Sequence, residues 1–465
     1  MSLFTVSKAA AACGGILFGP DINIDHRWCC DSREVVANGA FAAIRGAVTD
    51  GHLYIRQAIE HGAKVILAES NGAADLALLS SEYPDVAFIA AEDTEEALTA
   101  IAKAYLRCVN PRIVAITGSV GKTTTRELTA AALKKHLKVH SAIKSFNTLI
   151  GTSLTILSMA EDTKVLVLEF GTNHFGEIAE MVKNFPPQFA VITEVAPCHL
   201  AGFGTVEGVL KAKAEICASS RLESIVYNYD NTLLRDYMSH NIDNIKKVSV
   251  GKHDGADIKV EKCFVHLNEK GPSTTVCYSI GGKEVSLTSS LFGIQHAYNM
   301  GYAFAISSLF GMNASEIADG ISELSPISGR GVCKRCARNC WVIDEAYNAN
   351  PASLHAAIEN TYAVADTMGL KKEAILGGMR ELGEKSDEWH RKMIAELDGF
   401  DSVKLLGDEW HCCEPLPKGV KLYSSLNEIM ASASYGENES KIVLIKGSNS
   451  YGLKRVVEKF MGTQQ

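Results

Sequence analysis

One turn constrains the fold of this chain more than any other: a glycine-rich loop between a β-branched run and a helical stretch. Residues 112–117 read "RIVAIT", which is typical of a strand buried on both faces of a parallel sheet. The stretch "KTTTRELTAAALKKHL" follows the loop, and its spacing predicts a helix. Gly118 and Gly121 can adopt positive φ, so backbone N–H groups can face an anion at the helix N-terminus. The sequence therefore predicts a phosphate-binding loop.

This loop is shorter than the general nucleoside-triphosphate pattern, which has four residues between its first glycine and the Gly-Lys-Ser/Thr. Here only Ser119 and Val120 separate Gly118 from Gly121. In this placement the following Lys122 would reach the outer phosphates, and the hydroxyl of Thr123 would face Mg²⁺. The alternative is a glycine-capped turn with a solvated lysine.

The chain has 465 residues and is expected to form three domains, because this length exceeds one ordinary hydrophobic core. Residues 1–109 alternate short apolar runs with helical stretches and predict a small α/β domain. Residues 110–325 predict a mostly parallel sheet with helical crossovers. Within them, residues 251–290 predict an antiparallel annex of short strands. Residues 326–465 predict another doubly wound α/β domain.

Composition excludes several classes of function. A net charge of −8 leaves no electrostatic footprint for nucleic acid, and no apolar run approaches the ~20 residues that span a bilayer. The N-terminus reads as mature protein and not as a signal peptide. Thirteen scattered cysteines, an odd number, favour reduced thiols in a cytosol. The cluster Cys333, Cys336 and Cys340 has no second cysteine pair at zinc spacing, which favours a strand edge or turn with buried thiols.

Further segments resemble the Mur ligase superfamily, and the MurF branch in particular, along nearly the whole chain. They are, in chain order, "DSREVVANGAFAAIRGAVTDGH", "TGSVGKTTT", "SFNTLIGTSLTIL", "LEFGTNHFGEIAEM", "EVAPCHLAGFGTVEGVLKAKAEI", "GRG", "VIDEAYNANPASLHAAI" and "KGSNSYGLKRVV". The resemblance implies an α/β, three-domain Mur ligase architecture. A small α/β N-terminal domain (1–109) would bind the UDP substrate. A central P-loop-type domain with a β annex (110–325) would bind ATP, and a Rossmann-like ligase domain (326–465) would take the D-Ala-D-Ala side.

The resemblance also implies an activity: ATP-dependent addition of D-alanyl-D-alanine to UDP-N-acetylmuramoyl-tripeptide through an acyl phosphate, with Mg²⁺. Such a ligase serves peptidoglycan synthesis, and with it cell-wall biogenesis, cell shape and cell division. The implied partners are these small substrates and no nucleic acid or membrane. The protein is expected to be a cytoplasmic monomer.

Glu169 ends a predicted strand and His199 follows another, at the sheet edge where open α/β sheets bind ligands. From the residues alone, Glu169 could equally be a solvated loop residue. His199 could be a surface or packing residue. The resemblance makes Glu169 a Mg²⁺ ligand and has His199 support a second Mg²⁺. It also implies that Lys213, rather than the nearby Lys211, is carbamylated; from the residues alone, a surface lysine is the ordinary interpretation.

The catalytic positions implied by the resemblance are Lys122, Glu169, His199 and Lys213, and the metal ligands are Thr123, Glu169, His199 and carbamylated Lys213. The ATP-binding positions are Gly118, Ser119, Val120, Gly121, Lys122, Thr123, Thr124, Asn299, Arg330, Asp344 and Asn348. From the residues alone, Arg330 also fits a linker turn, and Asp344 also fits a helix N-cap.

The substrate-binding positions implied by the resemblance are Ser32, Arg33, Asp50, Gly51, Asn147, Thr148, Thr172, Asn173, His174, Lys446, Ser448 and Ser450. The first four would bind the uridine diphosphate end, and the next five would line the muramoyl-peptide path. The last three would close over the D-Ala-D-Ala side, with a ligand-free helix turn as the alternative.

Some residues depart from the family pattern. Gln295 and His296 replace the usual His and Asn of the adenine segment, and Thr148 and Ser153 replace a usual Asn and Pro. Gly378 stands where the family commonly has Asp. Because several of these changes lie on the substrate side, the ATP-ligase interpretation is firmer than the identity of the amino acid that is added.

Two rival functions remain open at this stage. One is another Mur-type carboxylate–amine ligase with a different acceptor amino acid or a non-cell-wall acid. The Asp-Asn-Pro-Arg type motif of the MurE branch is not found in the sequence. The other rival is a non-catalytic nucleotide-binding partner, which the retention of Lys122, Thr123, Glu169, His199 and Lys213 argues against.

Overall fold

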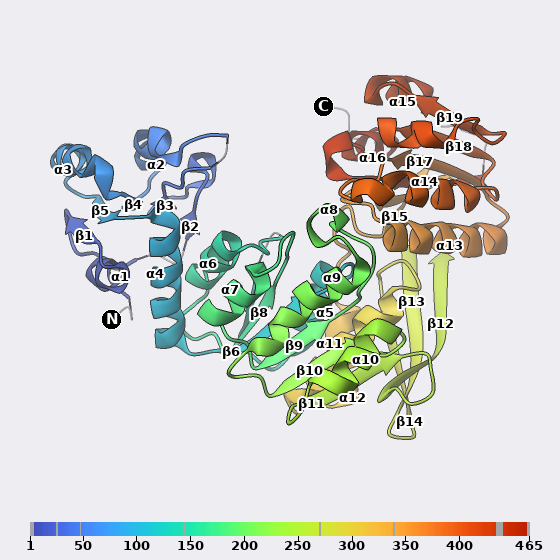
Figure 1. Cartoon of the computed structure of the whole chain (residues 1–465), viewed down its shortest axis with the longest axis horizontal. Helices are drawn as coiled ribbons and strands as arrows, with labels where there is room; N and C mark the ends of the chain where they lie inside the picture. The colour runs from blue at the N-terminus through green and yellow to red at the C-terminus, as the bar shows by residue number, and fades with distance from the viewer. Residues whose placement is uncertain are drawn as a thin grey trace.

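The computed structural model describes residues 4–24, 27–46, 48–142, 145–268, 271–337, 340–433 and 440–462. The chain folds into three blocks, each built on its own sheet, that follow one another from the N-terminus to the C-terminus (Figure 1). This arrangement confirms the predicted α/β three-domain fold. The predicted boundaries at residues 110 and 326 fall between the sheets and stay predictions at the level of single residues.

The first block contains a five-stranded sheet of order β1-β5-β4-β3-β2, in which only the β1–β5 pair is antiparallel. Its strands are β1 (Ile16–Phe18), β2 (Trp28–Cys29), β3 (Ala40–Ala42), β4 (Val65–Glu69) and β5 (Ala87–Ala91). Its helices are α1 (Val6–Cys13), α2 (Ile55–Glu60), α3 (Ala73–Glu82) and α4 (Thr94–Val109). Asp93 caps α4 by accepting a hydrogen bond from the backbone of Glu96 at 2.8 Å. The long α4 leads from this block into the central one (Figure 1).

The central block contains a nine-stranded sheet of order β14-β13-β12-β11-β10-β9-β6-β8-β7. Its strands are β6 (Arg112–Thr117), β7 (Val139–Ser141), β8 (Val165–Glu169), β9 (Phe189–Ile192), β10 (Ser224–Asn228), β11 (Lys246–Gly251), β12 (Ile258–Asn268), β13 (Gly271–Ile280) and β14 (Lys283–Ser289). The strands from β6 to β11 run parallel, whereas β12, β13 and β14 form antiparallel pairs. The predicted annex is therefore present, and β12 joins it to the parallel sheet by pairing with β11.

Helices cover both faces of this central sheet. They are α5 (Lys122–Leu133), α6 (Leu149–Leu157), α7 (Glu177–Asn184), α8 (Leu200–Phe203), α9 (Val206–Ala214), α10 (Thr232–Asn241), α11 (His296–Leu309) and α12 (Ala314–Ser322). The β6 strand lies inside this layered core, and residues 113–116 have no exposed surface. Its continuous apolar run is therefore explained by burial on both faces.

The third block contains a six-stranded sheet of order β15-β16-β20-β17-β18-β19, with only β15 antiparallel. Its strands are β15 (Val332–Ala337), β16 (Cys340–Glu345), β17 (Lys371–Gly377), β18 (Ser402–Leu406), β19 (Val420–Tyr423) and β20 (Lys441–Lys446). Its helices are α13 (Pro351–Met368), α14 (Ser386–Ala395), α15 (Leu426–Ser432) and α16 (Lys454–Phe460). The cysteine cluster lies on the β15–β16 hairpin. Within the described residues, no group of three His, Cys, Asp or Glu side chains is placed to hold a metal ion.

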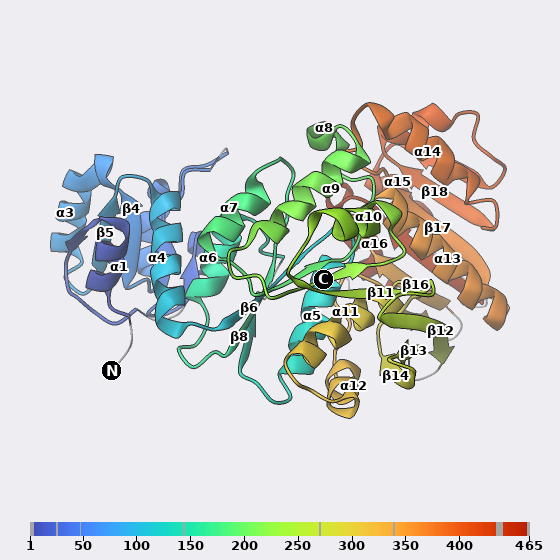
Figure 2. The same cartoon turned by 60° about the horizontal axis from the view of Figure 1, so that its bottom comes forward.

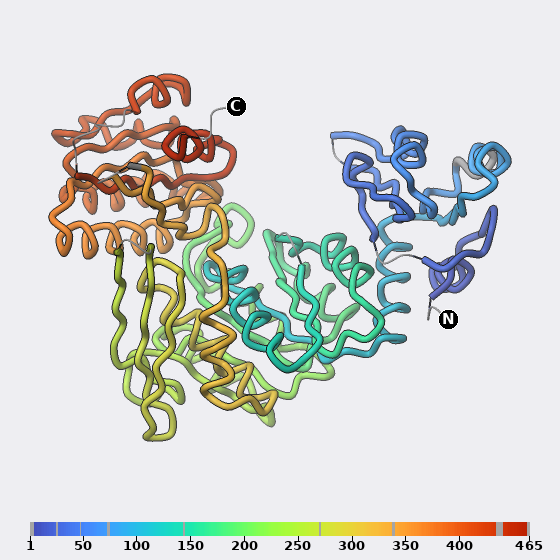
Figure 3. Tube along the Cα trace, turned by 180° about the vertical axis from the view of Figure 1, so that it is seen from behind, coloured from blue at the N-terminus to red at the C-terminus, as the bar shows by residue number. Residues whose placement is uncertain are grey.

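Polar contacts join the third block to the central block. Asn360 of α13 accepts a hydrogen bond from the backbone of Ile294 at 2.8 Å and donates to Gln295 Oε1 at 2.7 Å. Glu381, in the loop after β17, lies 2.6 Å from the ring of His199 at the start of α8. Figure 2 shows α8 beside the third block, and Figure 3 shows β12 and β13 from behind, reaching toward α13.

No helix among the described residues is long and apolar enough to cross a membrane.

Candidate active site

The phosphate loop joins β6 to α5 at the sheet edge, and its glycines are required by their surroundings. Gly118 has φ 148° and Gly121 has φ 85°. A Cβ atom on Gly118 would lie 1.9 Å from Thr193 Oγ1, at the end of β9. The loop is also fastened to β9, because the backbone N–H of Ser119 donates to the Glu194 carbonyl at 2.8 Å. The shortened loop is thus a braced strand-to-helix turn, as the sequence predicted.

The side chain of Lys122 folds back over this loop. Its Nζ donates to the Gly118 carbonyl at 2.7 Å, at the first position of α5. A cavity of about 1370 Å³ opens in front of the loop and extends from α4 of the first block to α13 of the third. A cation at a helix N-terminus beside a cavity of this size suits a bound polyphosphate.

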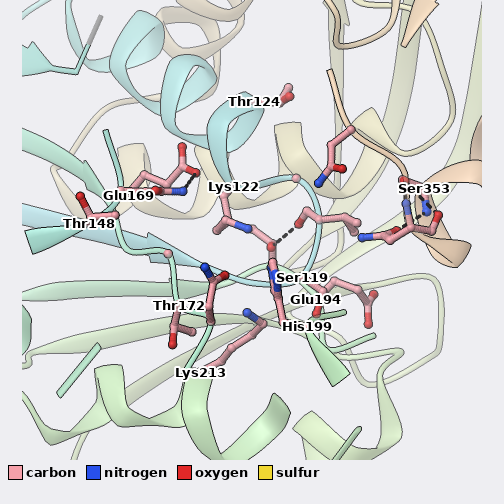
Figure 4. Close-up of a pocket in the computed structure, with 18 of the residues that line it drawn as sticks. Ser119, Lys122, Thr124, Thr148, Glu169, Thr172, Glu194, His199, Lys213 and Ser353 are labelled. Carbon is pink, nitrogen blue, oxygen red and sulfur yellow. Dashed lines mark hydrogen bonds between the residues drawn. The ribbon is translucent and has the colours of Figure 1, made fainter. Parts of the chain in front are cut away.

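Many of the predicted site residues line this one cavity. From the loop and the central block they are Ser119, Val120, Gly121, Lys122, Thr124, Asn147, Thr148, Glu169, Thr172, Asn173, His199, Lys213 and Asn299, and from the third block Arg330, Asn348 and Lys446. Figure 4 shows Lys122, His199 and Lys213 around the same space. The central sheet edge and the docked third block therefore bring together side chains that are up to about 300 residues apart in the sequence.

Glu169 lies at the end of β8, and its carboxylate is 2 % exposed. Its Oε2 accepts a hydrogen bond from Thr123 Oγ1 at 2.7 Å, and its Oε1 accepts one from Asn147 Nδ2 at 3.2 Å. The buried guanidinium of Arg126 lies 3.5 Å from the same Oε2. A carboxylate paired with a hydroxyl in this way offers the oxygen donors that Mg²⁺ prefers. Thr123 does not line the cavity itself but lies behind it, against Glu169.

His199 begins α8 with φ 49°, a left-handed backbone conformation that non-glycine residues rarely adopt. Its Nδ1 lies 2.6 Å from Glu381 Oε2 without the alignment of a hydrogen bond. Burial lowers the pKa of the imidazole, and the carboxylate of Glu381 opposes that shift. The strained backbone thus holds the ring between the cavity and the third block.

Lys213 is buried on the inner face of α9, whereas Lys211 is exposed on the outer face of the same helix. Burial lowers the pKa of the Lys213 ammonium to about 8, and the nearby Lys122 adds to this shift. Lys213 thus lies in the cavity and loses its proton more readily than an ordinary lysine. The assignment of the carbamate to this lysine stays a prediction.

Asn299 lies on α11 against the phosphate loop. Its Oδ1 accepts a hydrogen bond from Thr125 Oγ1 at 3.3 Å, and a Cβ atom on Gly121 would lie 2.7 Å from that oxygen. Asn299 Nδ2 donates to His296 Nδ1 at 3.2 Å, and burial lowers the pKa of His296 to about 4. Gln295, which replaces the usual His of the family, accepts a hydrogen bond from Asn360 of the third block.

The third-block positions differ in their surroundings. The Arg330 guanidinium stacks 4.0 Å from the ring centroid of Tyr347, and its Nη2 donates to Ser145 Oγ at 3.3 Å. The buried Asp344 does not line the cavity; its carboxylate accepts hydrogen bonds from the backbone of Gly329 at 2.9 Å and of Ala346 at 3.2 Å. It therefore holds the linker turn, and Asn350, not Asp344, is the cap of α13.

Lys446 is also engaged locally. It is 2 % exposed, and its Nζ donates to Glu345 Oε2 at 3.1 Å and to the Asn348 carbonyl at 3.0 Å. The Ser448 hydroxyl donates to the Gly378 carbonyl at 3.1 Å and accepts from the backbone of Arg380 at 3.3 Å. Neither Ser448 nor Ser450 lines the cavity.

The predicted uridine-diphosphate residues lie in the first block and do not line this cavity. Ser32 and Arg33 form the short helix 32–34, and Ser32 Oγ donates to Gln57 Oε1 at 2.7 Å. The exposed Arg33 pairs with Asp31 at 2.7 Å. Asp50 caps the short helix that begins at Gly51 by accepting from the backbone of His52 at 3.0 Å. Like His174, which is exposed and also outside the cavity, these positions stay predictions.

Sequence reasoning missed two acidic residues at the site. Glu194 lines the cavity at the end of β9, where Asn228 Nδ2 donates to it at 2.6 Å, and burial raises the pKa of its carboxyl. Glu381 reaches His199 from the third block. Glu194 lies at the end of a predicted strand, as Glu169 does, so its position in the sequence could have identified it as a candidate ligand. The second depends on how two blocks dock, which no local pattern reveals.

A phosphate loop between a buried parallel strand and a helix, inside the middle of three α/β blocks, defines a P-loop nucleotide-binding enzyme. Three family models match in chain order: "Mur ligase family, catalytic domain" over residues 26–106, "Mur ligase middle domain" over 116–307, and "Mur ligase, glutamate ligase domain" over 329–449. The chain belongs to the Mur ligase family.

Relatives of full length share this organisation. The UDP-N-acetylmuramoyl-tripeptide--D-alanyl-D-alanine ligase of Bacillus subtilis is 29 % identical, with 98 % of this chain and 97 % of that protein covered. The ligase of the same name from Haemophilus influenzae is 29 % identical, with 92 % of both chains covered.

Among solved structures, MurF from Acinetobacter baumannii superposes with a TM-score of 0.83 over 99 % of both chains at 21 % identity, a likeness of fold. The MurF ligase of Thermotoga maritima, solved in complex with ADP, superposes with a TM-score of 0.78 at 26 % identity. That match covers 94 % of this chain and 97 % of the other.

Proposed function

We propose that the protein is an ATP-dependent ligase that joins D-alanyl-D-alanine to UDP-N-acetylmuramoyl-tripeptide in peptidoglycan precursor synthesis. One observation carries this proposal: the braced phosphate loop with Lys122 opens onto a single cavity that the buried Glu169 and Lys213 also line. Full-length relatives of that name support the choice of substrates. Because the reaction consumes ATP and a nucleotide-linked precursor, we assign the enzyme to the cytoplasm.

The chemistry needs two steps, because a carboxylate does not react with an amine at neutral pH. The tripeptide carboxylate first attacks the γ-phosphorus of ATP, and ADP leaves from the acyl phosphate that forms. The amine of the dipeptide then attacks the acyl carbon, loses a proton and expels phosphate. Lys122 and the loop N–H groups would hold the phosphates and stabilise the charge that develops on them.

The donor set at the end of β8 fits Mg²⁺. Glu169 is buried and accepts from Thr123, so a carboxylate and a hydroxyl already converge at the edge of the cavity. Thr123 and Glu169 would hold the cation, with His199 and a carbamate on Lys213 beside them. Mg²⁺ would supply positive charge that neutralises the polyphosphate and the acyl phosphate. The protein residues themselves orient the two substrates and exclude water.

Phosphate release tests the proposed function directly. Purified protein with ATP, Mg²⁺ and UDP-N-acetylmuramoyl-tripeptide should release phosphate steadily only when D-Ala-D-Ala is added, in step with formation of the pentapeptide. Single amino acids in place of the dipeptide are the matched control. Release with a single amino acid and not with the dipeptide would contradict the assignment and favour a ligase with another acceptor.

Domain movement is expected during the reaction, because Lys122 of the central block and Asn348 of the third block line one cavity. An ATP analogue together with the muramoyl-tripeptide should change the small-angle scattering profile and the protease sensitivity of the protein. Lys122→Ala with the same ligands is the control, since it should hold the analogue poorly. An identical profile with and without both ligands would contradict closure.

A further inference from the structure

Outside the large cavity, a second set of charged side chains gathers on the third block. It lies at the carboxyl ends of three neighbouring parallel strands, β20, β17 and β18. The loop after β17 carries Arg380, the loop after β18 carries Glu409, and the loop after β20 carries Tyr451. Ligands of open α/β sheets bind at such an edge, so this cluster is placed where a substrate of the third block would lie.

The Glu409 carboxylate occupies space that only a glycine at position 378 leaves open. A Cβ atom on Gly378 would lie 2.5 Å from Glu409 Oε2 and 3.0 Å from the Tyr451 hydroxyl. A β-carbon at position 378 would therefore force the end of the Glu409 side chain to move. Position 378 is also where the family pattern commonly has Asp. In this chain the carboxylate at this sheet edge is that of Glu409, which follows β18, the strand next to β17.

Arg380 is held by this carboxylate and by an aromatic ring. Its Nε lies 3.5 Å from Glu409 Oε1, and its guanidinium lies 4.8 Å from the ring centroid of Tyr451. The Tyr451 hydroxyl donates a hydrogen bond to Glu409 Oε2. The Arg380 side chain nevertheless remains 52 % exposed. Half of a positioned cation thus faces outward from the sheet edge.

The backbone under Arg380 is fixed on both sides. The backbone N–H of Met379 donates to His390 Nε2 at 3.1 Å, and the N–H of Arg380 donates to Ser448 Oγ at 3.3 Å. A braced loop lets a long side chain bind a ligand with less loss of conformational entropy. The arrangement is that of a prepared binding group and not of a solvated surface arginine.

The same loop reaches the reacting centre at its next residue. Glu381 lies 2.6 Å from His199, which lines the cavity together with Lys122. Neighbouring Cα atoms are about 3.8 Å apart, so the backbone that carries Arg380 lies directly beside the residue that contacts His199 of the ATP cavity. A molecule held by Arg380 at one end can therefore extend toward the acyl phosphate.

We propose that Arg380 binds the carboxylate of the incoming dipeptide, and that Glu409 and Tyr451 are positioning residues for its guanidinium. The inference rests on the proposed function, in which a dipeptide must present its amine to the acyl phosphate and its carboxylate away from it. A guanidinium has five N–H donors in a fork that matches a carboxylate. Glu409 approaches from the Nε side, and the exposed part of the side chain faces the ligand.

The first test compares D-Ala-D-Ala with its C-terminal amide, which has the same shape but no carboxylate. Wild-type enzyme should prefer the dipeptide in kcat/KM by about ten- to hundredfold, the range of a charge-assisted hydrogen bond. Arg380→Ala should lose most of that preference, mainly through a higher KM for the dipeptide. The KM for ATP should change little. Arg380→Lys should recover only part of the preference, because an ammonium cannot bind bidentately.

The second test addresses the positioning residues. Glu409→Gln and Gly378→Ala should each raise the KM for the dipeptide several-fold while the KM for the amide stays nearly constant. Lys392→Ala is the matched control, since Lys392 lies on α14 of the same block, is 54 % exposed and pairs with Glu388 of its own helix. It should leave both KM values unchanged. Circular dichroism and thermal unfolding identify any variant that does not fold, and Arg380→Lys keeps a cation in place if Arg380→Ala is unstable.

The outcomes separate this inference from the proposed function. Wild-type enzyme that ligates the dipeptide and the amide equally well would overturn the role of Arg380 alone. So would an Arg380→Ala variant that retains the wild-type preference. Wild-type enzyme that ligates neither compound would overturn the proposed function, and the inference with it.

Discussion

Replacing Lys122 with alanine is expected to lower kcat by on the order of 10²-fold or more, with the fold intact. The Nζ atom now donates to the Gly118 carbonyl at 2.7 Å, so the ammonium already lies over the loop. With ATP bound it would face the outer phosphates, where negative charge develops as the γ-phosphoryl group is transferred. Alanine removes that charge while keeping a good helix former at the start of α5.

Phosphate release at saturating substrates measures this effect, and far-ultraviolet circular dichroism checks the fold. Lys134→Ala is the control, because Lys134 follows the last residue of the same helix and is exposed. It should turn over at nearly the wild-type rate. Turnover near wild type in Lys122→Ala would refute the phosphate-loop assignment, since no other role of the loop requires this ammonium.

The parts of the fold that could be predicted are those with a strong local pattern. The run at 112–117 is continuous because both faces of β6 are buried, and Gly118 is required because Thr193 leaves no room for a Cβ atom. The annex strands β12 and β14 alternate exposed residues with less exposed ones over much of their length, as a one-faced antiparallel strand does. Strands β1 and β2 have only three and two residues, too few to show the alternation of apolar and polar residues that predicts a strand.

The site divides in a similar way. Glu169 could be singled out because parallel strands end at one edge, so a polar residue directly after a buried strand is a candidate ligand. Glu381 could not, because its contact with His199 exists only once two blocks dock. Asp344 also lies near the carboxyl end of a strand, yet its carboxylate accepts hydrogen bonds from backbone N–H groups of Gly329 and Ala346. A strand-end position therefore identifies candidates but does not separate ligands from turn-stabilising residues.

Lys213 is expected to be carbamylated in the active enzyme. Its ammonium would lie in the cavity near Lys122 and near any Mg²⁺ held by Glu169, and two unit charges ~5 Å apart at an effective dielectric near 20 repel by about 3 kcal/mol. A carbamate at the same place carries negative charge and would attract the cation instead. The modification needs neutral amine and CO₂, and burial already lowers the pKa of this lysine to about 8.

Carbamylation should therefore increase with bicarbonate and with pH up to and beyond about 8, where most of the Lys213 side chain is neutral. Intact-protein mass spectrometry under native conditions, or a high-resolution electron-density map, would detect the added carboxyl group. A map with an unmodified Lys213 in protein prepared with bicarbonate at alkaline pH would contradict the assignment. The pH dependence distinguishes a lysine carbamate from a carboxylate that is present at every pH.

Removal of this side chain gives the strongest expected effect on the reaction. Lys213→Ala should lower kcat by at least on the order of 10²-fold, because the cation loses the group that orients it. Short carboxylic acids such as acetate should restore part of the activity by occupying the vacant anion position, whereas an ammonium salt should not. Lys211→Ala, two residues away on the exposed face of α9, should retain nearly full activity. Full activity in Lys213→Ala, or equal losses in the two variants, would contradict the specific role assigned to Lys213.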